Sequence, residues 1–306
     1  MQFAKRILMF LAVNLLVMLM LGIVFSVLMA FFPVLRQSGM GQLIVLSAVF
    51  GMGGALISWA FSRAIAKWLQ GVQLIDPATA TGDARWLLQT VHKLADQTGI
   101  STMPEVGIYE SEEINAFCTG PTKNSSLVAV STGLLRRMGH DEVEGVLAHE
   151  LSHASNGDMV TLTLVSGVVN TFVLLISFIV TNVIMSAMRG NDERRGGGFM
   201  DFFIRQIVFS TVQMAVGLLA SLAIVFPFSR WREYRADAGG AGLVGKRKMI
   251  SALQALQDNF RLPQAPAAEP SMAAMKIGSL KRNVFFSTHP DLDDRIARLR
   301  NLPLVD

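Results

Sequence analysis

The chain has 306 residues, 51% of them hydrophobic and only 16% charged, a mixture too apolar for soluble domains alone, so we expect part of it to lie in lipid. The formal net charge is +4, but no basic stretch interleaved with aromatic residues accompanies it, so we expect no nucleic-acid partner and assign the charge to a membrane surface. Cys118 is the single cysteine, which excludes an internal disulfide and requires any metal site to use histidines and carboxylates.

The first apolar run covers residues 7–32 and directly follows Lys5 and Arg6. It is longer than the apolar core of a signal peptide, and the segment 30–33 offers no small-residue cleavage site. The run is therefore predicted to stay in place as an uncleaved membrane anchor.

Four stretches are long and uncharged enough to cross a bilayer core of ~30 Å at ~1.5 Å per helical residue. They cover residues 7–32, 43–61, 160–188 and 207–228. We predict a polytopic protein in four parts: a transmembrane hairpin (1–62), the first part of a catalytic domain (63–159), a second hairpin (160–228) and the second part of that domain (229–306). Threonines and asparagines dilute the third stretch and leave open whether the second hairpin spans the bilayer fully.

Between the hairpins the pattern is that of a soluble module. Residues 83–99 have apolar side chains at helical spacing and end at a glycine. Short runs typical of strands follow at 105–109, 116–119 and 127–131. A second helix is expected from Asp141, as its N-cap, to Asn156-Gly157. The expected fold class is mainly α with a small β component.

That second helix carries the segment His149-Glu150-Leu151-Ser152-His153, the H-E-x-x-H pattern of zinc peptidases. Residues four apart on a helix leave it on one face, so His149 and His153 can share one Zn²⁺. Glu150 points to the flank, where a water bound to the metal would lie. The alternative, two solvated histidines on a polar helix, does not explain this spacing.

A catalytic zinc needs a third protein ligand and one open position. We expect His92 and His140 to be ordinary surface residues. Glu233 is the better candidate, because Asp237 lies one turn further on the same helix face, where it can accept the free N–H of a ligating histidine. The alternative is that both carboxylates are solvated partners of the neighbouring arginines.

Two crossings separate His153 from Glu233, so the chain returns to the side it left and the three ligands can meet. The arginines and lysines that flank the spans favour a cytoplasmic catalytic face. On the catalytic side they are Lys5, Arg6, Arg63, Lys67, Arg230, Arg232 and Arg235, and on the other side Arg36, Arg189, Arg194, Arg195 and Arg205.

Taken together, these features resemble the HtpX family of membrane metallopeptidases, relatives of the CAAX prenyl endopeptidases. The resemblance covers nearly the whole chain, through two pairs of apolar spans and the segments 115–117, 131–135, 147–158, 232–237, 288–290 and Arg295. It implies a zincin-type fold with a glutamate as third ligand. It also implies a cytoplasmic active site in the bacterial inner membrane and a quality-control role, with unfolded or misfolded membrane proteins as substrates.

By the same resemblance, His149, His153 and Glu233 bind one Zn²⁺ per chain, Glu150 is the general base, and Asp237 supports a ligand. His289 would stabilise the oxyanion, Arg295 would brace the site, and the strand near Asn115 would pair with substrate.

Two other readings compete with a peptidase at the membrane surface. In an intramembrane protease the H-E-x-x-H helix would lie inside an apolar span, but Asp141, Glu142 and Glu144 precede the motif. In a non-catalytic membrane scaffold or transporter, a structural zinc would have four protein ligands, and no fourth ligand is evident. We therefore expect a zinc-dependent endopeptidase.

Overall fold

The computed structural model describes residues 19–27, 30–31, 39–189, 198–261 and 289–303. They fall into two compact units. The helical unit comprises Met1–Ser58 and Thr163–Val225, and the sheet unit comprises Trp59–Leu162 and Phe226–Asp306.

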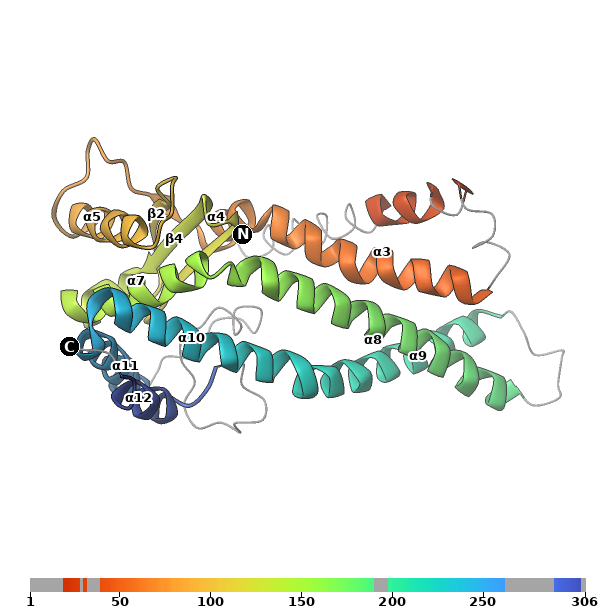
Figure 1. Cartoon of the computed structure of the whole chain (residues 1–306). Coiled ribbons are helices and arrows are strands. Elements are labelled where there is room, and N and C mark those ends of the chain that lie inside the picture. The colour runs from red at the N-terminus through yellow and green to blue at the C-terminus, as the bar shows by residue number, and fades with distance from the viewer. Residues whose placement is uncertain (1–18, 28–29, 32–38, 190–197, 262–288, 304–306) are drawn as a thin grey trace. The chain divides into compact units, whose positions relative to one another are not determined.

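In the helical unit, long apolar helices carry most of their side chains on the outside. They are α3 (Gly39–Ala60), α8 (Asp158–Arg189) and α9 (Phe199–Ala220), which continues through the π-helix η2 (Ser221–Val225) (Figure 1). Three helices of the described chain, Gly39–Ala60, Asp158–Met188 and Phe199–Val244, are long and apolar enough to cross a membrane. They contain the expected spans 160–188 and 207–228 and all of 43–61 except Phe61, which lies just beyond the end of α3. Most of the expected span 7–32 lies outside the described residues, although 19–27 are helical.

Small residues let α3 and α8 approach each other closely. A Cβ atom added to Gly51 of α3 would lie 2.5 Å from the backbone nitrogen of Thr171 in α8. A Cβ atom added to Gly167 of α8 would lie 2.6 Å from the sulfur of Met52 in α3. Such contacts replace the hydrophobic driving force that helices lack in lipid.

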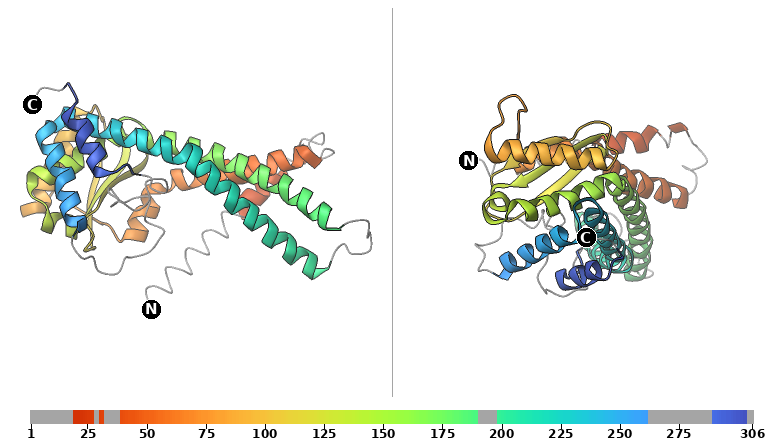
Figure 2. Two further views of the ribbon diagram at one scale, coloured as in Figure 1. Left: turned by 90° about the horizontal axis from the view of Figure 1, so that it is seen from below. Right: turned by 60° about the vertical axis from the view of Figure 1, so that its left-hand side comes forward.

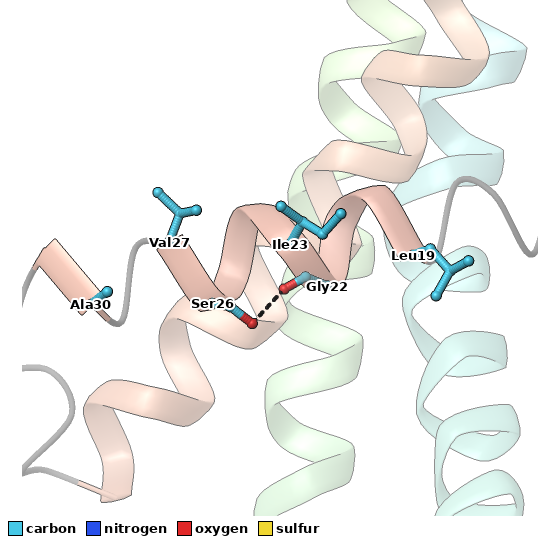
Figure 3. Close-up of a pocket in the computed structure, with 6 residues that line it drawn as sticks. All are labelled: Leu19, Gly22, Ile23, Ser26, Val27 and Ala30. Carbon is cyan, nitrogen blue, oxygen red and sulfur yellow. Dashed lines mark hydrogen bonds between the residues drawn. The ribbon is translucent and has the colours of Figure 1, made fainter.

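The helix at 19–27 shows how a polar side chain is accommodated on an apolar surface. Ser26 Oγ donates a hydrogen bond of 2.9 Å to the carbonyl oxygen of Gly22, one turn earlier (Figure 3). The surrounding shallow pocket is lined by Leu19, Gly22, Ile23, Ser26, Val27 and Ala30. The bond satisfies the hydroxyl within its own helix, so the serine needs no water there.

The sheet unit is built on a four-stranded sheet in the order β1-β2-β4-β3. Its strands are β1 (Gln73–Leu74), β2 (Glu105–Tyr109), β3 (Ala116–Thr122) and β4 (Ser125–Ser131). β2 and β4 are parallel and the other pairs are antiparallel. The three strands predicted at 105–109, 116–119 and 127–131 are confirmed, and β3 is an edge strand.

Seven helices of the described residues pack on this sheet or on one another and form most of the unit. They are α4 (Ser62–Gln70), α5 (Gly82–Gln97), α6 (Thr132–Arg137), α7 (His140–Ser155), α10 (Phe226–Val244), α11 (Lys246–Arg261) and α12 (Leu292–Arg300). α5 packs on β2, and α7 packs on β3, as the right-hand view of Figure 2 helps to show. The expected fold class, mainly α with a small sheet and membrane-spanning helices, is confirmed.

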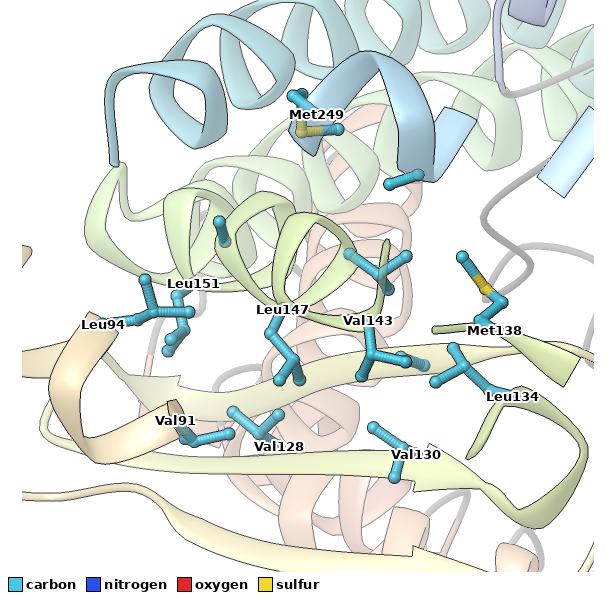
Figure 4. Packing of buried hydrophobic residues seen from close by; sticks show 14 of the residues in the cluster. Val91, Leu94, Val128, Val130, Leu134, Met138, Val143, Leu147, Leu151 and Met249 are labelled. Atoms are coloured by element: carbon cyan, nitrogen blue, oxygen red, sulfur yellow. The ribbon is translucent and has the colours of Figure 1, made fainter. Parts of the chain in front are cut away.

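The core lies between α7 and the sheet. It is filled by buried aliphatic side chains, among them Val91 and Leu94 of α5, Val128 and Val130 of β4, and Leu147 of α7 (Figure 4). The other face of α7 packs against α10 and α11, so the helix is enclosed on nearly every side. Gly145 of α7 permits this, because a Cβ there would lie 2.8 Å from the carbonyl oxygen of Lys248.

The beginning of α7 differs from the sequence prediction. The helix starts at His140 and its N-cap is Gly139, whereas Asp141 lies in the first turn. Glu142 supplies the cap interaction, since its Oε2 accepts a hydrogen bond of 2.9 Å from the Gly139 N–H. Asp141 is not the cap because it already lies inside the first turn, and its side chain pairs with Lys248 of α11 at 2.7 Å.

Candidate active site

The buried helix α7 presents two imidazoles side by side. His149 and His153 are one turn apart, with ring centroids separated by 4.7 Å and the rings nearly perpendicular. His149 is only 2% exposed, and Glu150 is also buried. Polar groups are placed in such an interior only when other groups satisfy them.

Glu233 of α10 faces both histidines. Its Oε2 lies 3.5 Å from His149 Nε2, and its Oε1 lies 3.3 Å from His153 Nε2. One ligand atom from each of the three residues lies within 4.8 Å of the others. Ligands about 2.0–2.1 Å from a tetrahedral zinc are about 3.3–3.4 Å from one another, so this donor set fits the ion.

Asp237 lies behind His149, one turn after Glu233. Its Oδ1 is 2.9 Å from His149 Nδ1. The guanidinium of Arg295, which is 0% exposed, donates to both carboxylate oxygens of Asp237, from Nε at 2.8 Å and from Nη2 at 2.6 Å. The structure therefore brings together Asp237, which the spacing singled out, and Arg295, which only the family resemblance singled out.

His153 has a carboxylate partner of its own, Asp158, which the sequence analysis did not single out. The distance from His153 Nδ1 to Asp158 Oδ2 is 2.6 Å, and Asp158 is 2% exposed. An acidic residue directly after the Asn156-Gly157 turn was the available signal. It was not sufficient, because the direction of the chain after a turn is set by tertiary packing.

His289 comes from the segment before α12 and reaches the same cluster. Its Nδ1 lies 2.9 Å from Glu233 Oε2. Asn115 is placed differently: its side chain is buried, its N–H donates to Ser131 Oγ, and its carbonyl oxygen accepts from the Ser131 N–H. Those contacts hold the beginning of β3 against β4, and the predicted role of that strand in binding substrate stays a prediction.

Glu150 is held by the edge strand. Its Oε2 accepts a hydrogen bond of 3.0 Å from the backbone N–H of Cys118 in β3. The sequence analysis missed this contact because any residue type can supply a backbone N–H. The carboxylate is thereby fixed between the helix that carries the histidines and the free edge of the sheet.

The carboxylates around the two imidazoles make the site attractive to positive charge. Burial lowers the pKa of His149, but hydrogen bonds to Asp237 and Glu233 outweigh burial and leave the pKa raised. Burial likewise opposes the charge on His153, yet hydrogen bonds to Asp158 and Glu233 raise its pKa to about 9. Without a metal the cluster therefore binds protons, and a divalent cation would replace them.

Comparisons with known proteins agree with this geometry. Residues 82–303 match the model of peptidase family M48. Protease HtpX of Tolumonas auensis is 48% identical over 300 residues, which cover 97% of this chain and 99% of the relative. A protease HtpX homolog of Neisseria gonorrhoeae is 50% identical over 299 residues, covering 97% and 100%.

The fold also resembles a solved structure, that of Ste24p from S. mikatae. The TM-score is 0.60 at 18% identity, and the match covers 94% of this chain but only 65% of the Ste24p chain. At that identity the likeness concerns the fold alone. The family match and the full-length relatives identify the chain as a member of peptidase family M48, an HtpX-type membrane metallopeptidase.

Proposed function

We propose that His149, His153 and Glu233 hold one Zn²⁺ per chain and that Glu150 is the general base of peptide-bond hydrolysis. The observation that carries the proposal is the convergence of three ligand atoms within 4.8 Å, beside a buried carboxylate. Two imidazoles and one carboxylate form a donor set typical of catalytic zinc sites, which keep a position open.

Each residue has a distinct task in this proposal. When bound, the zinc ion supplies Lewis acidity and lowers the pKa of water. Glu150 accepts a proton from the attacking water and passes it to the leaving amine. His289, which lies against Glu233, donates a hydrogen bond to the oxyanion that develops on the scissile carbonyl. Asp237 and Arg295 hold His149 in place.

The edge strand β3 is the proposed docking site for substrate. Asn115 anchors its beginning to β4, and Cys118 places its backbone beside Glu150. An extended peptide could add to this edge through backbone hydrogen bonds, which recognise any sequence. Such tolerance suits an enzyme that cleaves unfolded or misfolded membrane proteins, and we propose this quality-control role.

We further propose that the catalytic domain, made of residues 63–159 and 229–306, faces the cytoplasm from the bacterial inner membrane. The flanking hairpins are 1–62 and 160–228. Residues 59–162 and 226–306 form one compact unit, which supports a catalytic domain made of two separate parts of the chain. The even number of expected spans and the charges that flank them support the orientation.

An intramembrane protease is not favoured, because α7, which carries the motif, is not among the membrane-spanning helices of the described chain. The decisive experiment measures metal content beside cleavage of an unfolded protein in purified wild type, Glu150→Gln and His149→Ala. Wild type that binds no zinc, or that cleaves nothing with zinc bound, would refute the proposal.

A further inference from the structure

His149 and His153, the two histidines of the proposed metal site, each have a carboxylate at the Nδ1 atom. The partner of His149 is Asp237, at 2.9 Å, and the partner of His153 is Asp158, at 2.6 Å. In both rings Nε2 is the atom nearer to Glu233. A histidine that binds a metal through one ring nitrogen usually donates the other N–H to such a carboxylate, which fixes the tautomer and the orientation of the ring.

A sharp change of chain direction brings Asp158 back to His153. α7 ends at Ser155, and Gly157 has a φ of +71°, in the left-handed region that favours glycine. The turn lets α8 start at Asp158, only five residues after His153. Asp158 is also an acidic residue in the first turn of a helix, where the helix dipole stabilises its negative charge.

Two arginines of α10 donate hydrogen bonds to backbone carbonyl oxygens of this turn. Nη1 of Arg232 donates to the carbonyl oxygen of Asp158 at 3.4 Å, and Nη2 of Arg235 donates to that of Asn156 at 3.5 Å. These arginines belong to the same helix as Glu233. The helix α10, which carries the proposed ligand Glu233, therefore binds the backbone carbonyl oxygens of the turn. The Asp158 carboxylate remains in contact with His153.

We propose that Asp158 is a positioning residue that orients His153 as a metal ligand, as Asp237 orients His149. The inference rests on the proposed zinc site and adds a residue to it. Asp158 is the first residue of the membrane helix α8, so the orientation of the ligand His153 depends on where that helix begins. The ligand Glu233 lies on α10, which continues from the membrane helix α9 through η2.

The test is the zinc dissociation constant, measured by competition with a chelator on the full chain in detergent. Asp158→Ala is expected to weaken zinc binding ~10–100-fold, the usual effect of losing the carboxylate behind a ligating histidine. Asp158→Asn keeps an acceptor oxygen without the charge, so its zinc affinity should lie between Asp158→Ala and wild type. Asp141→Ala is the matched control, because Asp141 is also an acidic residue at a helix start but pairs with Lys248.

Two further measurements separate positioning from folding. The metal-free Asp158→Asn protein should still unfold cooperatively, and well above the temperature of the zinc measurement, while its zinc affinity is lower than that of wild type. His153→Ala should lose zinc altogether, which tests the proposed site independently. If His153→Ala loses zinc while Asp158→Ala and Asp158→Asn bind it within twofold of wild type, the inference about Asp158 is wrong and the proposed function stands.

Discussion

The backbone N–H of Cys118 donates a 3.0 Å hydrogen bond to Oε2 of Glu150. This bond joins the edge strand β3 to the helix α7 at the proposed catalytic base. A carboxylate that accepts a backbone hydrogen bond keeps a defined position without a charged partner. The geometry of the proposed base thus depends on the strand that is proposed to dock the substrate.

Glu150→Gln is expected to keep zinc and lose peptide hydrolysis by ~10²–10⁴-fold, the usual contribution of a general base. Glutamine can still accept the hydrogen bond from the Cys118 N–H, but it cannot take a proton from water. Metal analysis and cleavage of an unfolded protein, measured on one preparation, show both effects. His149→Ala should lose zinc and activity together and reveals any contaminating protease. Wild-type cleavage rates in Glu150→Gln would refute the assigned mechanism.

Substitutions at Cys118 should separate the role of its backbone from that of its side chain. Cys118→Ala is expected to retain activity, because the thiol is not the donor to Glu150. Cys118→Pro removes the N–H, and an edge strand tolerates proline where that N–H does not bond to the neighbouring strand. A hydrogen bond to a charged group contributes about 1.5–3 kcal/mol, so hydrolysis should fall about 10–100-fold with zinc still bound. Equal activity in the two variants would mean that the bond does not matter for catalysis.

Arg295→Ala is expected to destabilise the sheet unit. The substitution leaves the carboxylate of Asp237 buried without its bidentate partner, a change that costs about 3–5 kcal/mol. The unfolding temperature should fall by about 6–20 °C. Arg295→Lys keeps the positive charge but cannot make both hydrogen bonds to the carboxylate, so its unfolding temperature should lie between those of wild type and Arg295→Ala. Arg136→Ala breaks a pair with Glu112 that is more than half exposed on both sides and should leave the unfolding temperature unchanged.

Zinc affinity should increase with pH up to about pH 9. In the metal-free site the His153 pKa is raised to about 9, so at neutral pH the ion must displace a proton. The stability of the metal-free protein should have the opposite dependence. A raised folded-state pKa stabilises the fold below the ordinary histidine value of about 6.5, and this contribution is lost as the pH rises through about 9.

Chelator competition and melting curves at pH 6, 7, 8 and 9 would measure both trends. A zinc dissociation constant that does not change between pH 7 and 9 would contradict the protonated state assigned to the metal-free site.

Thiol labelling in intact cells can establish the orientation. Thr102 is exposed in the sheet unit, and Met200 is exposed at the start of α9, and the proposed topology puts these two positions on opposite sides of the membrane. The Cys118→Ala background removes the native thiol. A membrane-impermeant reagent should label Met200→Cys in intact cells but Thr102→Cys only after permeabilisation. The reverse pattern would place the proposed active site outside the cytoplasm.

Local features of this protein could be predicted from the order of its residues. A spacing of four residues places His149 and His153 on one helix face whatever surrounds the helix, and Glu233 and Asp237 follow the same rule. Uninterrupted apolar runs likewise predict membrane helices, because a helix in lipid satisfies its own backbone. Both kinds of inference depend on covalent spacing and helix geometry.

The contacts that complete the site could not be predicted in this way, because they depend on how separate elements pack. The Cys118 N–H and Glu150 are 32 residues apart, and Arg295 and Asp237 are 58 residues apart. Asp158 is close to His153 in sequence, but its contact depends on the Gly157 turn and on the α10 arginines that hold that turn. Likewise, Asp141 does not cap α7, because the helix begins before it at His140, and its side chain pairs with Lys248 of a distant helix. Partners such as a backbone amide or a returning carboxylate leave no periodic pattern, since packing between separate elements sets which groups meet.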